Sequence, residues 1–140
     1  CTSKTEKVSK LILYVDGASK GNPGPSGIGV VVCDAQGKVL TEIKRILPET
    51  TNNIAEYQAL ICGLEEALVR KASEVCVRSD SELIVKQSSG QYKVRADHLK
   101  PLAEQVKQLA GGFHRVIFQQ IPREQNKLAD RLAKNASRRK

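Results

Sequence analysis

The stretch that decides the fold is Lys10-Leu-Ile-Leu-Tyr-Val-Asp-Gly-Ala-Ser-Lys-Gly-Asn-Pro-Gly-Pro-Ser-Gly-Ile-Gly-Val-Val-Val-Cys-Asp34. Its apolar, partly β-branched beginning predicts a strand over residues 10–16 that ends in a Gly/Pro-rich loop over 17–27. A second strand is expected over 27–34, followed by a short hairpin turn at Ala35-Gln36-Gly37. A third strand over 38–47 would complete an antiparallel meander.

The rest of the chain alternates helical and strand patterns. We expect a helix over 53–71, a strand over 74–79, a helix from Asp80 to Gln87, a helix over 96–110, a strand over 114–121 and a helix over 124–136. This order predicts an α/β fold: a five-stranded mixed sheet, three antiparallel strands and then two parallel ones, flanked by helices. We expect one domain over 10–137, a flexible segment over 1–9 and a basic tail over 138–140.

The composition indicates the kind of partner. The chain has 140 residues, which suffices for one domain with a hydrophobic core. Its formal net charge of +8 favours a polyanion, with nucleic acid ahead of an anionic membrane surface. No apolar run approaches the roughly 20 residues that span a bilayer. Cys33, Cys62 and Cys76 lie among apolar residues and are typical of core thiols in a reducing compartment, although a disulfide between two of them stays open.

Four acidic residues stand in or beside apolar elements: Asp16, Glu56, Asp80 and Asp130. A carboxylate is costly there unless something compensates its charge, and several together would repel one another. A hard divalent cation is the usual remedy. If the first and fourth strands are parallel neighbours, Asp16 and Asp80 meet at the crevice beyond their carboxyl ends. The alternative for Glu56 and Asp130 is that they are ordinary acids near helix N-termini, favoured by the dipole.

Four motifs in order resemble type 1 ribonucleases H over about residues 10–136. They are Asp16-Gly-Ala-Ser-Lys-Gly-Asn-Pro-Gly-Pro, Thr50-Thr-Asn-Asn-Ile-Ala-Glu-Tyr-Gln-Ala-Leu60, Ser79-Asp-Ser-Glu-Leu83 and Arg123-Glu-Gln-Asn-Lys-Leu-Ala-Asp-Arg-Leu-Ala133. The resemblance implies the ribonuclease H-like fold. It also implies endonucleolytic hydrolysis of the RNA strand of RNA/DNA hybrids, which leaves 5′-phosphate and 3′-hydroxyl ends.

The resemblance further implies two Mg²⁺ ions bound together with substrate, for which Mn²⁺ is a chemical alternative. Asp16 would bridge both ions, Glu56 and Asp80 would serve the leaving-group side, and Asp130 would serve the nucleophile side. Glu56 would also accept a hydrogen bond from a ribose 2′-hydroxyl, which distinguishes RNA from DNA.

The residues that match substrate contacts of the family are polar or small. They are Gly17, Ser19, Asn22, Thr51, Asn52, Asn53, Gln58 and Ser81. Tyr92 and Lys93 are expected to contact substrate in place of a Trp that some family members use in a DNA-binding channel, since a loop aromatic beside a cation suits stacking on a sugar or base. A turn and a helix N-cap would explain Thr51 without substrate, and Tyr92 has a plain packing role as its alternative.

The chain departs from well-known members of that family in three ways. No His precedes the fourth acid; Arg123 stands there instead, and we expect it to contact phosphate because it stays charged. Its alternative is an ion pair with Glu124. The chain has no Trp, and the basic protrusion of some members is missing between Gln87 and Ala96. These features resemble an Arg-containing subtype without the His loop or the protrusion.

Three function classes follow from this pattern. The first is a metal-dependent ribonuclease H, the second a nucleic-acid-binding relative without activity, and the third a nuclease of the same fold acting on double-stranded RNA or serving a reverse transcriptase or transposase. A doubly wound nucleotide-binding protein is disfavoured because no Gly-x-Gly-x-x-Gly follows the first strand. We expect a cytoplasmic monomer that acts on a hybrid duplex, with no membrane association and no small-molecule cofactor.

Overall fold

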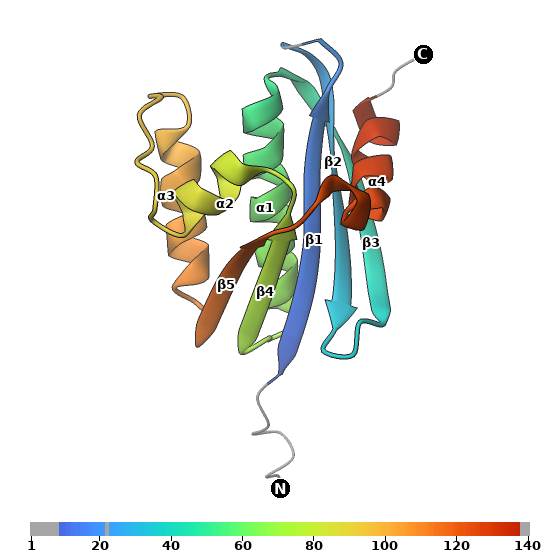
Figure 1. Ribbon diagram of the computed structural model, residues 1–140, viewed down its shortest axis with the longest axis vertical. Coiled ribbons are helices and arrows are strands. Elements are labelled where there is room, and N and C mark those ends of the chain that lie inside the picture. Colours follow the sequence, from blue (N-terminus) through green and yellow to red (C-terminus); the bar gives the residue numbers. More distant parts are fainter. Residues whose placement is uncertain (1–8, 22, 138–140) are drawn as a thin grey trace, which may run out of the picture.

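The computed structural model describes residues 9–21 and 23–137, and these form a sheet with helices on both faces (Figure 1). The elements in chain order are β1 (Lys10–Ser19), β2 (Gly24–Asp34), β3 (Val39–Thr50), α1 (Asn52–Val69), β4 (Glu74–Ser79), α2 (Glu82–Ser88), α3 (Lys100–Ala110), β5 (Arg115–Gln120), the 3-10 helix η2 (Arg123–Gln125) and α4 (Lys127–Ser137). The expected tail 138–140 and all but Ser9 of the expected flexible segment 1–9 lie outside the described residues.

The sheet has the predicted topology. Its strand order is β3-β2-β1-β4-β5. The pairs β1–β2 and β2–β3 are antiparallel, whereas β1–β4 and β4–β5 are parallel. The prediction of a mixed sheet with three antiparallel and then two parallel strands is therefore confirmed.

The three meander strands are longer than the sequence pattern indicated. β1 continues past Asp16 to Ser19, because the residues of the Gly-rich loop pair with β2 as far as Ser19↔Ser26. β3 continues through Pro48 to Thr50. A proline without an N–H is tolerated there because β3 is an edge strand of the sheet.

Three helices begin later than predicted, and each has a local cause. α2 starts at Glu82 because Ser81 is its N-cap, accepting a hydrogen bond from the Ile84 N–H at 3.3 Å. α3 starts at Lys100 rather than residue 96, with a proline in its first turn, because a proline further inside would lose a hydrogen bond and clash with the preceding turn. The last helix is divided into η2 and α4 by Asn126.

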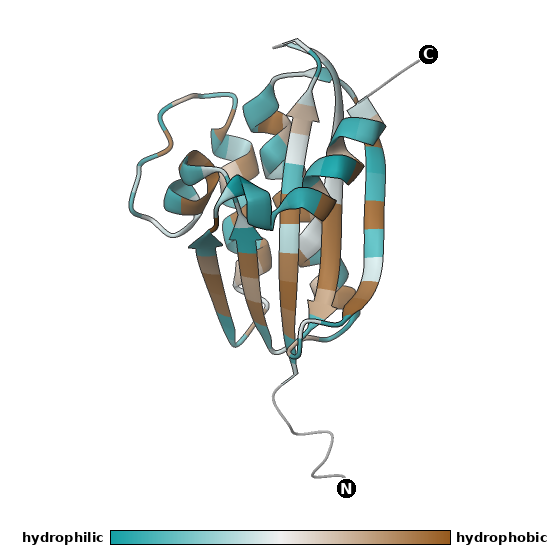
Figure 2. Cartoon of the chain, turned by 45° about the vertical axis from the view of Figure 1, so that its right-hand side comes forward, coloured by the Kyte–Doolittle hydropathy of each residue, from teal (hydrophilic) through white to brown (hydrophobic). Residues whose placement is uncertain are grey.

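The two faces of the sheet carry different layers. α1 packs against β1 and β2 on one face, with α3 beside it, and α4 packs across β2, β1 and β3 on the other (Figure 1). The main core lies on the α1 face and contains fully buried Leu13, Val30 and Tyr57. Figure 2 shows apolar residues concentrated along the strands, while teal, hydrophilic residues alternate with apolar ones along the edge strand β3.

The approach of α4 to the sheet depends on small residues on both sides. A β-carbon at Gly29 would lie 2.3 Å from the carbonyl oxygen of Ala129, so any larger residue would push the helix away. Ala129 and Ala133 are fully buried at this contact. The close packing brings the N-terminal half of α4, and with it Asp130, to the sheet.

The predicted cysteine environment is confirmed for the described residues. Cys33, Cys62 and Cys76 are buried free thiols. Cys33 and Cys76 pair with Ile12 from opposite sides of β1, so a whole strand separates them. Among the helices of the described residues, none combines the length and apolarity that crossing a membrane requires.

Candidate active site

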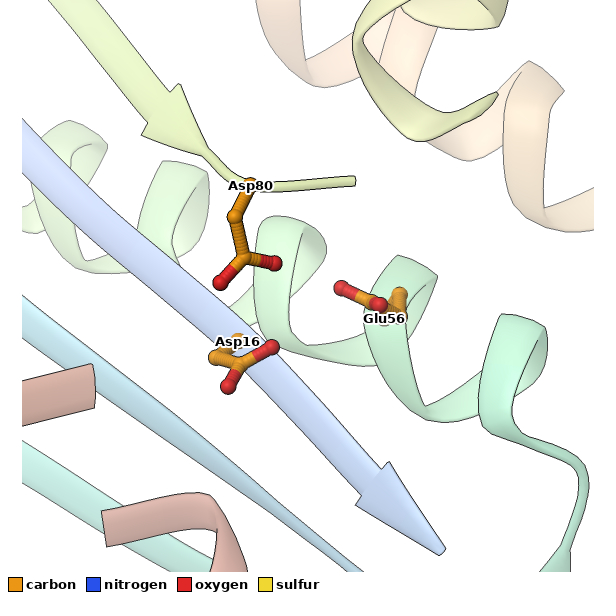
Figure 3. A group of neighbouring side chains, drawn as sticks. All are labelled: Asp16, Glu56 and Asp80. Atoms are coloured by element: carbon orange, nitrogen blue, oxygen red, sulfur yellow. The ribbon is translucent and has the colours of Figure 1, made fainter. Parts of the chain in front are cut away.

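Three carboxylates converge where β1 and β4 separate. One oxygen from each of Asp16, Glu56 and Asp80 lies within 4.8 Å of the other two. Figure 3 shows the three side chains pointing toward one another from β1, α1 and the residue after β4. The prediction that Asp16 and Asp80 meet at this crevice is confirmed, and the three acids do not point into separate regions of solvent.

The crevice follows from the strand register. The pairing of β1 with β4 ends at Tyr14↔Arg78. Beyond this pair, β1 continues beside β2 while the chain leaves β4 at Ser79. Asp16 and Asp80 are each two residues past the last pair, so their carboxylates flank the opening between two parallel strands.

Glu56 reaches the crevice because α1 touches β1. A β-carbon at Gly17 would lie 2.4 Å from the Glu56 nitrogen, so only glycine permits this approach. Thr51 caps the helix by accepting a hydrogen bond from the Ile54 N–H at 3.3 Å. Glu56 therefore lies one turn into the helix, directly over the strand that carries Asp16.

Burial and crowding change the protonation of two of these acids. Desolvation, followed by the charge of Glu56, raises the pKa of Asp16 to about 9. Desolvation, followed by the charge of Asp80, raises the pKa of Glu56 to about 8, against the lowering effect of the Gly17 N–H and the Arg123 charge. Without a cation, the site therefore retains protons at neutral pH, which is the behaviour expected where negative charges lack compensation.

Asp130 lies beside this group rather than inside it. Its side chain hydrogen-bonds Asp16 and lies 3.2 Å from the Lys134 ammonium, one helical turn later. Desolvation alone would raise the pKa of Asp130, but the hydrogen bond with Asp16 and the Lys134 ammonium together lower it. The protein's own groups therefore favour the ionised form of Asp130.

The four acids line one cleft of about 410 Å³, and cationic side chains line the same cleft. Its lining consists of Asp16, Gly17, Ala18, Ser19, Lys20, Asn52, Glu56, Asp80, Arg123, Asp130, Lys134 and Ser137. Arg123 lowers the pKa of both Glu56 and Asp130 through its charge. Within the described residues, no ion pair joins Arg123 to Glu124, which disfavours the alternative interpretation of this arginine.

The residues predicted to contact substrate divide into groups. Gly17, Ser19 and Asn52 line the cleft. The other described ones, which do not line it, are Thr51, Asn53, Gln58, Ser81, Tyr92 and Lys93. Asn22 lies outside the described residues.

Some of these residues have internal roles that the structure makes plain. The Ser19 hydroxyl donates to the Thr50 carbonyl at 2.9 Å and so ties the end of β1 to the end of β3. The half-exposed Tyr92 donates to Glu82 at 2.9 Å and lies under the Lys86 ammonium, 5.3 Å from the ring centre. Tyr92 therefore presents an anchored aromatic ring on the loop between α2 and α3.

Two lysines and an asparagine are among the residues of the site that sequence reasoning missed. Lys20 and Lys134 line the cleft, and buried Asn126 hydrogen-bonds Asp80. The spacing of Lys134, four residues after Asp130, is a helical ion-pair signal that the sequence does contain. Lys20 and Asn126 stand inside two of the four motifs, but their spacing carried no comparable signal, because the residues that they meet in the site come from distant parts of the chain.

The comparisons agree with this fold. Residues 14–136 match the family described as "Reverse transcriptase-like". The chain is 44% identical over 128 residues to the "Bifunctional protein Rv2228c" of Mycobacterium tuberculosis, a match that covers 91% of this chain and 35% of that protein. It is 37% identical over 131 residues to the "Ribonuclease HI" of Halobacterium salinarum, covering 94% of this chain and 66% of that protein. The chain thus spans about a third of the length of the first of these relatives.

A solved structure supports the same assignment. The structure of LC11-RNase H1 in complex with an RNA/DNA hybrid superimposes with a TM-score of 0.84 at 44% identity, over 89% of this chain and 94% of that chain. The chain therefore belongs to the ribonuclease H-like branch of the reverse transcriptase-like family.

Proposed function

We propose that this chain is an endoribonuclease that hydrolyses the RNA strand of RNA/DNA hybrids with divalent metal ions. The observation that carries the proposal is the convergence of Asp16, Glu56 and Asp80 within 4.8 Å in a cleft rimmed by cations. The hybrid bound to LC11-RNase H1 supports the choice of substrate. The positive net charge of the whole chain, +8, favours association with a duplex of phosphates.

The donor set fits a hard divalent cation. Carboxylate oxygens are the ligands that Mg²⁺ prefers, and Mn²⁺ accepts them too. Asp16, Glu56 and Asp80 would hold the first ion, and Asp130, next to Asp16, would help to hold a second when substrate phosphate adds its oxygens. Ions bound there would supply an activated water and stabilise the leaving 3′-oxygen.

The chain's own cations would orient the scissile phosphate. Arg123, Lys20 and Lys134 lie around the acids, so a phosphate entering the cleft meets positive charge at the rim and carboxylates at the floor. Arg123 cannot give up its proton near neutral pH, so it would bind phosphate and would not shuttle protons. This is the role we assign to it in a chain that resembles the subtype without a catalytic-loop His.

Selection of RNA would rest on residues near the start of α1. Glu56 would accept a hydrogen bond from a ribose 2′-hydroxyl, and Asn52 lines the same cleft. We assign hybrid contacts to Gly17 and Ser19 in the cleft and to the neighbouring residues of the same motifs. These neighbours are Asn22, Thr51, Asn53, Gln58 and Ser81.

A second contact region is proposed on the loop after α2. The exposed ring of Tyr92 and the adjacent Lys93 suit stacking on a sugar and attraction to a phosphate. Tyr92 and Lys93 do not line the cleft with the acids, so they would contact a part of the duplex away from the cleaved bond. A cytoplasmic location and a monomeric state stay predictions from the sequence.

The test is cleavage of a defined duplex with a labelled RNA strand. We expect cleavage of the hybrid with Mg²⁺ or Mn²⁺, none with a chelator, and products with 5′-phosphate and 3′-hydroxyl ends. Double-stranded RNA, double-stranded DNA and Asp16→Asn serve as controls. Hybrid binding without cleavage in either metal would identify an inactive binding relative, and preferential cleavage of double-stranded RNA would identify a different nuclease of the same fold.

A further inference from the structure

Buried Asn126 connects three of the four acids of the cleft. It is 2% exposed and lies between η2 and α4. Its side-chain amide donates to the backbone carbonyl of Val15 at 3.0 Å and to Asp80 Oδ2 at 3.5 Å. Its own backbone carbonyl accepts the N–H of Asp130 at 3.0 Å. One residue is therefore bonded to the residue before Asp16, to Asp80 and to Asp130.

The two acceptors fix the orientation of this amide. A carbonyl and a carboxylate both require a donor, so rotating the amide by 180° would place Oδ1 against two acceptors. In the orientation observed, Asn126 Oδ1 is buried and has no hydrogen-bond partner among the described residues. An unpaired buried acceptor is unfavourable for folding. This unfavourable arrangement occurs at a residue whose amide nitrogen links the Val15 carbonyl to the Asp80 carboxylate.

The Asn126 amide lies where backbone pairing between β1 and β4 ends. The β1–β4 pairing ends at Tyr14↔Arg78, and Val15 is the next residue of β1. At this point β4 stops pairing with β1, although it stays paired with β5 as far as Ser79, and the Asn126 amide donates to the Val15 carbonyl instead. Asn126 therefore bridges the ends of two strands that no longer pair with each other, through the carbonyl of Val15, next to Asp16, and the carboxylate of Asp80.

We propose that Asn126 is a positioning residue that sets the separation of the Asp16 and Asp80 carboxylates and ties both to the start of α4. It touches neither substrate nor reacting atoms and acts through the acids alone. Removing the Asn126 side chain should weaken divalent-ion binding and slow turnover. The affinity for the hybrid should stay the same, because it depends on residues elsewhere. The inference rests on the proposed metal-dependent function.

Two variants test this role and one serves as the control. Asn126→Ala removes the amide, and Asn126→Asp keeps its shape but offers no N–H donor when ionised. Gln125→Ala changes the exposed neighbouring residue in η2. Each protein is measured by calorimetric titration with Mn²⁺ alone, by kcat and KM on a hybrid, and by melting without metal.

We expect Asn126→Ala to weaken Mn²⁺ binding at least fivefold and to lower kcat at least tenfold, with KM for the hybrid within twofold of the parent. Asn126→Asp should lose kcat similarly, and Gln125→Ala should match the parent. A purely structural role would lower the melting temperature and leave Mn²⁺ affinity and kcat unchanged. Mn²⁺ affinity and kcat within twofold of the parent in either folded Asn126 variant would overturn the inference.

The titration separates this inference from the proposed function, because it needs no substrate. A parent chain that binds Mn²⁺ but leaves the hybrid intact contradicts the function alone, and the Asn126 variants still decide the positioning role by their Mn²⁺ affinity. A parent chain that binds no Mn²⁺ contradicts both. If Asn126→Ala does not fold, Asn126→Asp carries the test, because its side chain fills the same space.

Discussion

Gly17 and Ala55 are in direct backbone contact: a β-carbon at Gly17 would lie 2.3 Å from the carbonyl carbon of Ala55. This is far closer than two carbon atoms approach without a bond between them. β1 and the first turns of α1 therefore pack with no side chain between them. The contact sets the distance between Asp16, one residue before Gly17, and Glu56, one residue after Ala55.

Replacing Gly17 with alanine should move α1 away from β1 and separate these two acids. Overpacking of this kind costs about 1–3 kcal/mol of stability, and we expect a loss of hybrid cleavage larger than the loss of stability explains. Thermal melting and kcat would be measured together. Gly111→Ala is the matched control, because Gly111 has a φ of −66° and its nearest neighbour would lie 3.4 Å from the added carbon. A Gly17→Ala protein with parental kcat would contradict the assigned contact.

Asp16→Asn should abolish cleavage and stabilise the metal-free fold. The folded protein keeps a proton on Asp16 up to about pH 9, whereas the unfolded chain loses it near pH 4. The folded state therefore binds more protons across this window, and the free energy of unfolding falls as pH rises through it. The amide removes this dependence, so the gain should be larger at pH 8.5 than at pH 5.

Melting in a chelating buffer at both pH values checks this prediction. A gain of at least about 3 °C is expected at pH 8.5, which corresponds to roughly 1 kcal/mol for a chain of this size. Asp97→Asn is the control, since the Asp97 side chain is 95% exposed and forms an ion pair with Lys100, far along the chain from the acids of the cleft. Adding Mg²⁺ should raise the melting temperature of the parent more than that of Asp16→Asn. An equal gain at both pH values would contradict the raised pKa of Asp16.

Arg123→Gln should weaken hybrid binding and lower turnover without abolishing it. If Arg123 neutralises one phosphate, the slope of log affinity against log salt should decrease by about one. Binding would be titrated at several salt concentrations with a chelator present, so that no cleavage occurs. Arg70→Gln is the control, because Arg70 follows the far end of α1 and pairs with Glu66. Unchanged turnover together with an unchanged salt slope would leave Arg123 without a role in substrate handling.

Tyr57→Phe should destabilise the fold and leave the chemistry intact. The Tyr57 hydroxyl, on a fully buried side chain, donates to Gln87 Oε1 at 2.5 Å and links α1 to α2. Desolvation raises the pKa of this phenol to about 12, so it stays a donor over the whole working range of pH. Its loss should cost about 1–2 kcal/mol in denaturant unfolding, with kcat within twofold of the parent. A large loss of kcat would place Tyr57 in the catalytic machinery.

The sequence predicted the architecture better than the limits of its elements. Alternating apolar strands and helical periodicity gave the order of the elements, and the topology followed from it. Three helices begin at residues 82, 100 and 127, and the sequence pattern predicted each start two to four residues too early. The starts depend on an N-cap at Ser81, a proline at residue 101 and the break at Asn126. The ends of β1 and β3 were placed too early because pairing with β2 overrides the turn preference of Gly and Pro.

The site was predictable where a residue's role depends on its own chemistry. Buried acids need compensation wherever they lie, so Asp16, Glu56 and Asp80 could be singled out along the chain, and Arg123 by its permanent charge. Contacts made across the fold were not predictable. Ser19 donates to the Thr50 carbonyl, Lys20 and Lys134 line the same cleft, and Asn126 reaches a residue of β1 that lies 111 positions earlier in the chain.

The linear order of residues by itself determined which side chains carry charge at apolar positions, which segments become strands or helices, and hence which acids have to be compensated together. Only the tertiary structure decided how near they come to one another, that Asp130 stands beside the group and not within it, and that an asparagine fills the gap between two separating strands. The physical reason is that charge and local conformational preference belong to each residue and its neighbours. Distances of a few ångströms between distant residues are set by packing, here by glycines that allow helices to touch the sheet.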